Sequence, residues 1–171
     1  GLICHPDEGE KVHTLLTYAQ AYLYQKGAWK PGQGFAPALC NRIDRFTGGI
    51  VILAKCEEAL KVMDQKIRTR EVEKYYLCAV HGRMKYPEGT LRHFLLKKPE
   101  QKKVTVLNRS EPGAKETITY YRAVDENNGL TLCECLLGTG RTHQIRAQFA
   151  HIGHPLLGDN QYGKATLNEK Y

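Results

Sequence analysis

Long hydrophobic runs are missing from this sequence of 171 residues. No stretch approaches the roughly 20 apolar residues that a membrane-spanning helix needs. The first residues, "GLICHPDEGE", lack the charged and then apolar pattern of a secretion signal. Low-complexity tracts and internal repeats are also absent, and 42% of the residues are hydrophobic, which excludes disorder as the default. We therefore expect one domain over residues 1–171, in the cytoplasm and without membrane association.

The six cysteines lack the CxxC spacing of zinc sites and redox sites. Cys133 and Cys135 are separated by one residue in a run predicted to be extended, which places both on one face of a strand. We expect all six cysteines to be reduced thiols, most of them small core residues, and we expect no metal site.

Positive charge is in excess and unevenly spread. The net charge is +7, and residues 92–115 hold seven basic side chains against two acidic ones. Such a segment suits a polyanion, because each neutralised phosphate releases counterions. The alternative is a solvated hairpin whose lysines discourage edge-to-edge pairing. Charge alone does not decide between the two.

Helical and extended patterns alternate in the first part of the chain. Apolar residues at helical spacing predict a helix over residues 14–26, with Gly27 as its C-terminal stop. A loop rich in glycine and proline follows. Five consecutive apolar residues, 50–54, then predict a strand buried on both faces. An apolar stripe predicts a second helix over about residues 57–69.

The second part changes to strand patterns. The turn residues Asn127-Asn128-Gly129 predict a hairpin. A short helix is expected after residue 142, with Thr142 as N-cap and Gly153 as its stop. Antiparallel hairpins mixed with a few helices indicate an α+β fold. The expected strands are "EKYYLCAV" (73–80), "KVTVL" (103–107), "TITYYRAV" (117–124) and "LTLCECLL" (130–137).

The stretch "NRIDRFTGG" (41–49) places charges directly before the apolar run. Arg42 and Arg45 flank Asp44, and positive charge nearby favours the ionised form of its carboxyl group. An ionised carboxylate in a cleft can be a nucleophile, a base or a metal ligand, although no other carboxylates cluster here to support the ligand role. The alternative is an ion pair that closes the end of the strand.

The second candidate segment, "GRTHQIR" (140–146), opens with a glycine and leads into the short helix. Arg141, His143 and Arg146 there suit an anionic partner, although singly such residues are more often ordinary surface residues. If Arg146 faced Asp44, the two would form a half-buried ion pair, in which either partner left alone would be costly.

Together the segments resemble the RluA-type pseudouridine synthases. "NRIDRFTGGIVILAK" is similar to that family's H-R-L-D-x-x-T-S-G-L-L-L-L-A-K signature, and "GRTHQIRAQFAHIGHPLLGDNQYG" to its later G-R-T-H-Q-I-R block. "EVEKYYLCAVHG", between them, resembles the family's K-x-Y-x-A-x-V-x-G strand. The resemblance implies a mixed, mostly antiparallel sheet with flanking helices and a central RNA-binding cleft. Asn41, Ile43, Gly48 and Gln148 depart from the family's common residues. The family's usual strands at both ends and an S4 domain are missing, so we expect an incomplete catalytic domain.

The resemblance also implies roles for individual residues. Asp44 takes the place of the catalytic aspartate, and Arg146 that of the arginine that pairs with it. Tyr76 matches a tyrosine that packs on the uracil and is implicated in proton removal. Arg42 matches an arginine that helps displace the target base. The expected RNA-binding residues are Arg42, Lys97, Lys98, Lys102, Lys103, Arg141 and His143.

The implied activity is the isomerisation of uridine to pseudouridine in structured RNA. No atoms are gained or lost in that reaction, so no cofactor is expected. The expected substrate is large-subunit ribosomal RNA, with transfer RNA as the alternative, and the expected state is a monomer. Two alternatives are an RNA-binding module that keeps the fold without catalysis and a nucleoside or glycoside hydrolase that uses Asp44.

Overall fold

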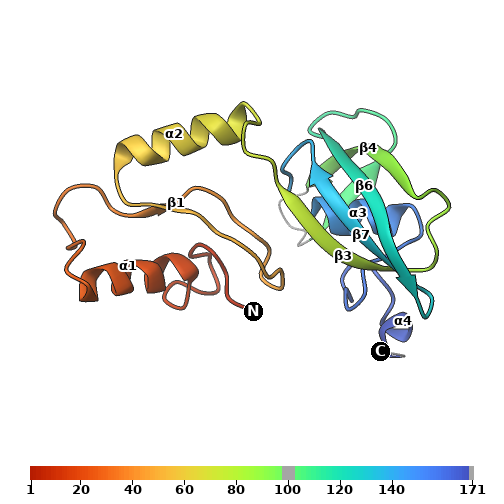
Figure 1. The fold of residues 1–171 in the computed structure, drawn as a ribbon, viewed down its shortest axis with the longest axis horizontal. Coiled ribbons are helices and arrows are strands. Elements are labelled where there is room, and N and C mark those ends of the chain that lie inside the picture. The colour runs from red at the N-terminus through yellow and green to blue at the C-terminus, as the bar shows by residue number, and fades with distance from the viewer. Residues whose placement is uncertain (98–102, 170–171) are drawn as a thin grey trace. The chain divides into compact units, whose positions relative to one another are not determined.

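The computed structural model describes residues 1–97 and 103–169. The chain forms two compact units, Gly1–Val72 and Glu73–Tyr171 (Figure 1). Each unit has its own helices and its own sheet, so each is described by itself.

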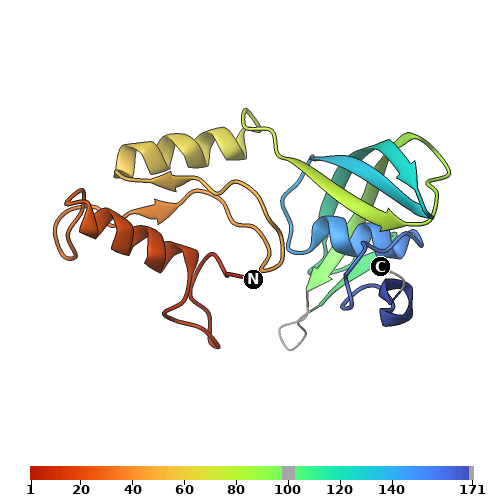
Figure 2. The same ribbon diagram turned by 60° about the horizontal axis from the view of Figure 1, so that its bottom comes forward.

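The first unit consists of two helices and a short hairpin. Helix α1 spans Leu15–Gln25, and the Thr14 hydroxyl caps its start by accepting the N–H of Thr17 at 3.1 Å. Gly27, with φ of 66°, follows its C-cap, which confirms the predicted helix and its stop. Helix α2 spans Glu57–Arg68. Strands β1 (Ala38–Leu39) and β2 (Leu53–Ala54) pair antiparallel, and Figure 2 shows the two helices on either side of them.

The prediction of a fully buried strand over residues 50–54 is wrong. Only Leu53 and Ala54 join the β1–β2 ladder, whereas Ile50 is 84% exposed and Ile52 is 36% exposed. A continuous apolar run is buried on both faces only in the middle of a covered sheet. The described sheet of this unit has two strands, so the first part of the run lies outside the ladder.

The second unit is built on a five-stranded antiparallel sheet in the order β3-β7-β6-β4-β5. Three expected strands are confirmed as β3 (Tyr75–His81), β5 (Val104–Leu107) and β7 (Leu130–Leu137), and β6 (Lys115–Asn127) is longer than expected. The hairpin between β6 and β7 turns at Asn128 and Gly129, whose φ angles of 51° and 76° fit a type I′ turn.

Strand β4 (Glu88–Lys97) was not expected from the sequence. Its first half is mostly polar with only Leu91 buried, and its apolar residues cluster at Phe94–Leu96, so it shows no clean period of two. Its place comes from its neighbours, because it pairs with β6 on one side and with β5 on the other.

Helix α3 (Gln144–His151) packs against one face of this sheet (Figure 2). Phe149 is fully buried against the sheet, and its ring lies edge-on to that of Tyr121 at 5.7 Å between centroids. Cys133 and Cys135 are also fully buried, so the prediction that they share one face is confirmed. All six cysteines are free thiols. A short helix, α4, spans Ala165–Asn168.

The predicted N-cap of α3 is off by one residue. His143 rather than Thr142 holds the N-cap position, in a left-handed conformation with φ of 53°. The start is set by the next residue, Gln144, which is 3% exposed. Its side-chain oxygen accepts the N–H of Arg141 at 3.0 Å, and its amide group donates to the Ile118 carbonyl at 2.8 Å. This anchoring leaves Thr142 outside the helix and exposed.

A buried polar network fixes α3 on the sheet. The Thr119 hydroxyl donates to Gln148 at 2.7 Å and accepts from Gln144 at 2.8 Å, and Thr119 and Gln148 are fully buried. The Gln148 amide group also donates to the Leu91 carbonyl at 3.0 Å. Buried polar groups of this kind stabilise a fold only while all of their partners remain.

We therefore expect Thr119→Val to lower the free energy of unfolding by about 1–3 kcal/mol, because the isosteric change removes the hydroxyl that donates to the buried Gln148 oxygen and one of the two hydrogen bonds that the Gln144 amide group donates. Urea denaturation of the protein, monitored by the near-UV circular dichroism of its tyrosines, measures this loss. Thr105→Val, at an exposed position of β5 in the same sheet, is the matched control and should be nearly neutral. Equal effects of the two changes would contradict the importance of the network.

Candidate active site

Asp44 lies in a tight turn of the first unit. Its carbonyl accepts the N–H of Thr47 at 2.9 Å, and its side chain is partly buried. The preceding residue, Ile43, is tied to Cys4, because its N–H lies 3.5 Å from the Cys4 sulfur and its carbonyl accepts from that thiol at 3.5 Å. Arg42 is exposed. The turn therefore presents a carboxylate beside a cation on a loop that is anchored at one end.

Asn41 closes the base of the same loop. Its side-chain amide donates to the Ile50 carbonyl at 3.2 Å, and its side-chain oxygen accepts the N–H of Ile52 at 2.8 Å. The Asn41 side chain thus bonds to one backbone carbonyl and one backbone N–H, as a neighbouring strand would. The adjacent residue Cys40 donates its backbone N–H to the Ile52 carbonyl at 2.8 Å. This bridge fixes where the loop of residues 42–49 leaves the β1–β2 hairpin.

Arg146 belongs to the second unit and forms a bidentate ion pair with Asp159. Its Nε and Nη2 atoms lie 2.6 and 3.1 Å from the two carboxylate oxygens, and Nη2 also donates to Gln161 at 2.8 Å. The Arg146 side chain is 22% exposed and that of Asp159 is 6% exposed. Paired forks of this geometry are among the stronger polar contacts in proteins.

The carboxylate of Asp159 is held in its charged form. Burial by itself would raise the pKa of Asp159, but hydrogen bonds from the Arg146 guanidinium and from the N–H groups of Tyr162 and Gln161 outweigh burial and lower it. The negative charge in turn keeps the Arg146 side chain in one position, so α3 carries a cation with a fixed orientation.

Tyr162 connects this ion pair to further basic residues. Its ring centroid lies 5.1 Å from the Arg146 guanidinium and 5.9 Å from the Lys103 ammonium group. Its hydroxyl accepts the N–H of Val104 at 2.9 Å and is hydrogen-bonded to His143 Nδ1 at 2.8 Å. One aromatic ring therefore gathers cations from α3 and from the segment before β5, as expected for cation–π contacts.

Tyr76 lies on the side of β3 that faces α3. It is partly buried and packs against the same core cluster as Ile145 of α3, and it stands opposite Cys135 in the β3–β7 register. The second unit therefore brings Tyr76 and Arg146, two of the three predicted catalytic residues, onto elements that share one core.

The predicted RNA-binding residues belong to both units, with Arg42 on the loop of the first unit and the others in the second unit. Lys97 ends β4 and Lys103 precedes β5, and both are exposed. Arg141 is exposed before α3, and its Nε donates to the Glu116 carbonyl at 3.3 Å. Lys98 and Lys102 lie outside the described residues. Lys97, Lys103 and Arg141 are thus exposed basic residues around the β4–β5 hairpin and the start of α3, whereas His143 is partly buried and bonded to Tyr162.

Three residues of the candidate site were missed by sequence reasoning. Asp159 and Tyr162 stand in the second family-like block, where Asp-x-x-Tyr was a usable signal, and Asn41 was noted only as a departure. The predicted ion pair between Asp44 and Arg146 joins residues of different units and stays a prediction.

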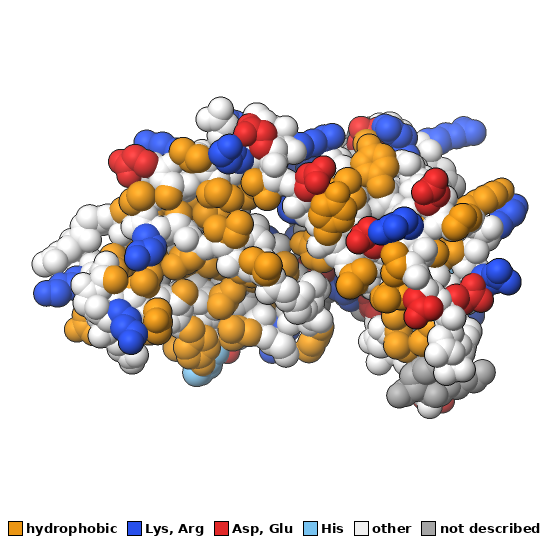
Figure 3. Space-filling model, in the orientation of Figure 1, with side chains coloured by type: hydrophobic (Ala, Val, Ile, Leu, Met, Phe, Trp, Pro, Cys, Tyr) orange, Lys and Arg blue, Asp and Glu red, His pale blue; other side chains and the backbone are white. Residues whose placement is uncertain are grey.

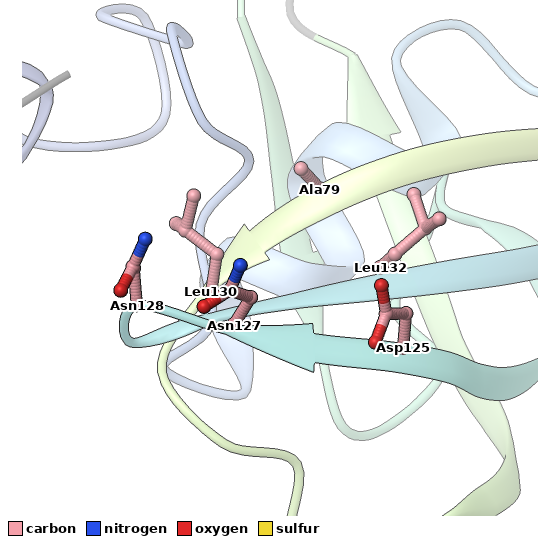
Figure 4. A pocket seen from close by; sticks show the side chains of 6 residues that line it. All are labelled: Ala79, Asp125, Asn127, Asn128, Leu130 and Leu132. Atoms are coloured by element: carbon pink, nitrogen blue, oxygen red, sulfur yellow. The ribbon is translucent and has the colours of Figure 1, made fainter.

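Neither of two surface hollows contains a predicted catalytic residue. A hollow of about 640 Å³ in the first unit is lined mainly by apolar residues and glycines around Phe46. Another of about 260 Å³ lies at the β6–β7 turn, on a part of the sheet where Asp125 is its one titratable lining residue (Figure 4). Figure 3 shows hydrophobic side chains mixed with acidic and basic ones over β3, β7 and β6. Asp44, Tyr76 and Arg146 are all absent from the linings of the two hollows.

Within residues 1–97 and 103–169, no group of three or more His, Cys, Asp and Glu side chains is arranged to hold a metal ion. In the same part of the chain, no helix has the length and apolar character to cross a membrane.

A model of the RNA pseudouridylate synthase family matches residues 1–151. This range includes the Asp44 loop, the Tyr76 strand and α3, and the match covers most of the chain. The chain therefore belongs to the RNA pseudouridylate synthase family, which confirms the resemblance to the RluA type.

Curated relatives agree with this membership. An uncharacterized RNA pseudouridine synthase of Aquifex aeolicus is 34% identical over 166 residues, covering 95% of this chain and 51% of the relative. Ribosomal large subunit pseudouridine synthase D of Xylella fastidiosa is 32% identical over 165 residues, covering 95% of this chain and 46% of the relative. The chain thus spans about half the length of the curated relatives it matches.

Solved structures confirm the fold. Human RNA Pseudouridylate Synthase Domain Containing 4 is similar with a TM-score of 0.72 and 22% identity, over 96% of this chain and 69% of that one. Human RNA Pseudouridylate Synthase Domain Containing 1 gives a TM-score of 0.71 and 22% identity, over 91% and 63% of the two chains. The α+β architecture expected from the sequence is that of these domains.

The Arg146–Asp159 pair provides a stability test. We expect Asp159→Asn to lower the free energy of unfolding at pH 7 by about 3 kcal/mol, because it leaves a partly buried guanidinium without its carboxylate. Urea denaturation measures the change. Glu116→Gln, which breaks the exposed Arg92–Glu116 pair, is the matched control and should cost about 0–1 kcal/mol.

The pH dependence of the same pair has a definite sign. Because the pKa of Asp159 is lowered in the folded protein, its stabilisation is present above the ordinary carboxyl range and is lost as the pH falls through the lowered value. The difference between the wild type and Asp159→Asn should therefore shrink in acid. A constant difference down to acid unfolding would contradict the charged state of Asp159.

Proposed function

We propose that residues 1–171 form the catalytic domain of an RNA pseudouridine synthase, an isomerase that converts specific uridines in structured RNA to pseudouridine. The observation that carries the proposal is the family match over residues 1–151, which includes both the Asp44 loop and α3. The anchored carboxylate of Asp44 and the exposed basic residues near α3 support it.

The reaction requires one carboxylate near the sugar. The N1–C1′ glycosidic bond of uridine breaks, the uracil turns, and its C5 joins C1′, while the proton on C5 is removed and N1 gains one. Asp44 either attacks C1′, attacks the uracil ring or accepts a sugar proton, as carboxylates do in glycoside chemistry. In each of the three routes the carboxylate of Asp44 is the reacting group.

The second unit would supply the other groups. Tyr76 would pack on the uracil and take part in removing its C5 proton, and Arg146 would orient the carboxylate of Asp44. Asp159 is a positioning residue in this scheme, because it acts through Arg146. Arg42 would help displace the target base, which costs a few kcal/mol of lost stacking.

We propose large-subunit ribosomal RNA as the substrate, with transfer RNA as the alternative. The support is that two of the relatives, from Xylella fastidiosa and Buchnera aphidicola, are named ribosomal large subunit pseudouridine synthases D and C. A cytoplasmic location and a monomeric state are part of the same proposal.

Replacing the carboxylate tests the proposed chemistry. We expect Asp44→Asn to lower pseudouridine formation in a large-subunit rRNA transcript by at least about 100-fold, because the amide can neither attack nor accept a proton. Carbodiimide modification followed by primer extension maps the product, and filter binding should show that RNA affinity is largely kept. Asp64→Asn, an exposed acidic residue of α2, is the control and should have normal turnover.

The outcomes separate the three candidate functions. Full turnover by Asp44→Asn would remove the catalytic assignment. RNA binding by the wild type without product would favour the non-catalytic module. Release of free uracil or an abasic site would favour a hydrolase, because the isomerase releases nothing.

The exposed lysines of the β4–β5 hairpin give a separate prediction. We expect the double change Lys97→Gln, Lys103→Gln to weaken RNA binding and to reduce the slope of log K against log salt by about 1–2, because each phosphate contact releases counterions. Lys85→Gln is the control, since Lys85 is exposed before the other end of β4. An unchanged slope would exclude this hairpin as a phosphate contact.

A further inference from the structure

The side chain of Phe46 is 85% exposed, although it lies two residues after Asp44. Arg45 and Phe46 are the central residues of the turn that the 2.9 Å hydrogen bond from Thr47 to Asp44 closes. Single exposed apolar residues are common on protein surfaces and need no explanation. This ring, however, lies on the loop that carries the candidate catalytic carboxylate, where an exposed aromatic side chain can contact the substrate.

A cation lies beside the ring. The guanidinium of Arg45 is 5.8 Å from the Phe46 ring centroid, and its Nε donates to the Gly1 carbonyl at 3.0 Å. An exposed aromatic face next to a held positive charge is the combination on which unpaired bases stack while their phosphates are neutralised. The loop therefore offers an RNA strand both a stacking surface and a phosphate contact.

The chain length between the two residues limits which bases the ring can reach. The Cα atoms of Asp44 and Phe46 can be no more than about 7 Å apart, because each residue adds at most about 3.6 Å. Stacked bases are spaced by about 3.4 Å along a strand, so this reach limits the ring to the base next to the target or the one beyond it. When a target uridine leaves its stack, the adjacent base loses a stacking partner on that side. Phe46 can replace that partner.

Resting on the proposed function, we propose that Phe46 is an RNA-binding residue whose ring stacks on the base next to the target uridine. Stacking tolerates every base but is stronger for the larger ring system, so Phe46 favours a purine at that position. This assigns Phe46 a part in the choice of substrate, distinct from the chemical step at Asp44.

Fluorescence tests the contact directly. The sequence has a single tryptophan, Trp29, so the double change Trp29→Phe, Phe46→Trp places the one indole at the proposed site. In the Asp44→Asn background the RNA is not consumed. The probes are single-stranded RNA oligonucleotides in which the target uridine is flanked by adenosine or by an abasic ribose. We expect quenching of the tryptophan by the adenosine probe and much weaker quenching by the abasic probe.

Affinity and kinetics give the second readout. We expect Phe46→Ala to weaken binding of the adenosine-flanked RNA about 5- to 150-fold, the range of base–aromatic stacking, and to raise KM more than it lowers kcat. Phe46→Tyr keeps the flat ring and should restore binding, whereas Phe46→Leu should not. Ile50→Ala is the matched control, because Ile50 is 84% exposed nearby but has no aromatic face.

Equal quenching by both probes, or Phe46→Leu binding as tightly as the wild type, would overturn the proposal. Failure of the stacking role can be told apart from failure of the proposed function. If the wild type forms pseudouridine and Phe46→Ala has an unchanged KM, only the stacking role is rejected. Loss of the catalytic assignment would come instead from full turnover by Asp44→Asn, and the fluorescence measurement reports binding rather than turnover.

Discussion

The contact that most constrains the second unit is the buried bond set between α3 and β6. Helix α3 has eight residues, too few to be stable by itself in water, so its position depends on tertiary contacts. Gln144 and Gln148 are four residues apart, lie on one side of the helix and both bond to Thr119. Arg146, two residues after Gln144, points about 200° away from that side, toward Asp159. The buried amides therefore decide where the cation of the candidate site is held.

The loop of residues 41–49 follows the same logic with a different device. Asn41 bridges Ile50 and Ile52, and Cys4 is tied to Ile43, so side chains rather than a strand ladder hold the loop that carries Asp44. At the tip of the loop Arg45 is held by the Gly1 carbonyl, whereas the side chains of Phe46 and Ile50 are exposed. A loop that is firm at its base and open at its tip suits the recognition of a flexible strand of RNA.

Several parts of the structure could be predicted because their signals are local. The apolar spacing of residues 14–26 and the glycine after it define α1, and the Asn128-Gly129 turn defines the β6–β7 hairpin. Strand β4 and the burial of residues 50–54 could not be predicted, because both depend on how many strands lie beside them. The start of α3 was placed one residue early, because Thr142 is a better N-cap by type but the long-range bonds of Gln144 decide the boundary.

The candidate site divides in the same way. The sequence by itself determined the α+β class, the family and the identity of Asp44, Tyr76 and Arg146 as candidates, because these rest on motif spacing and short-range patterns. Only the tertiary structure decided that Arg146 is held by Asp159, that Tyr162 gathers the nearby cations and that Phe46 is exposed. The physical reason is that pairing and burial depend on distances between residues remote in sequence, which local patterns do not encode.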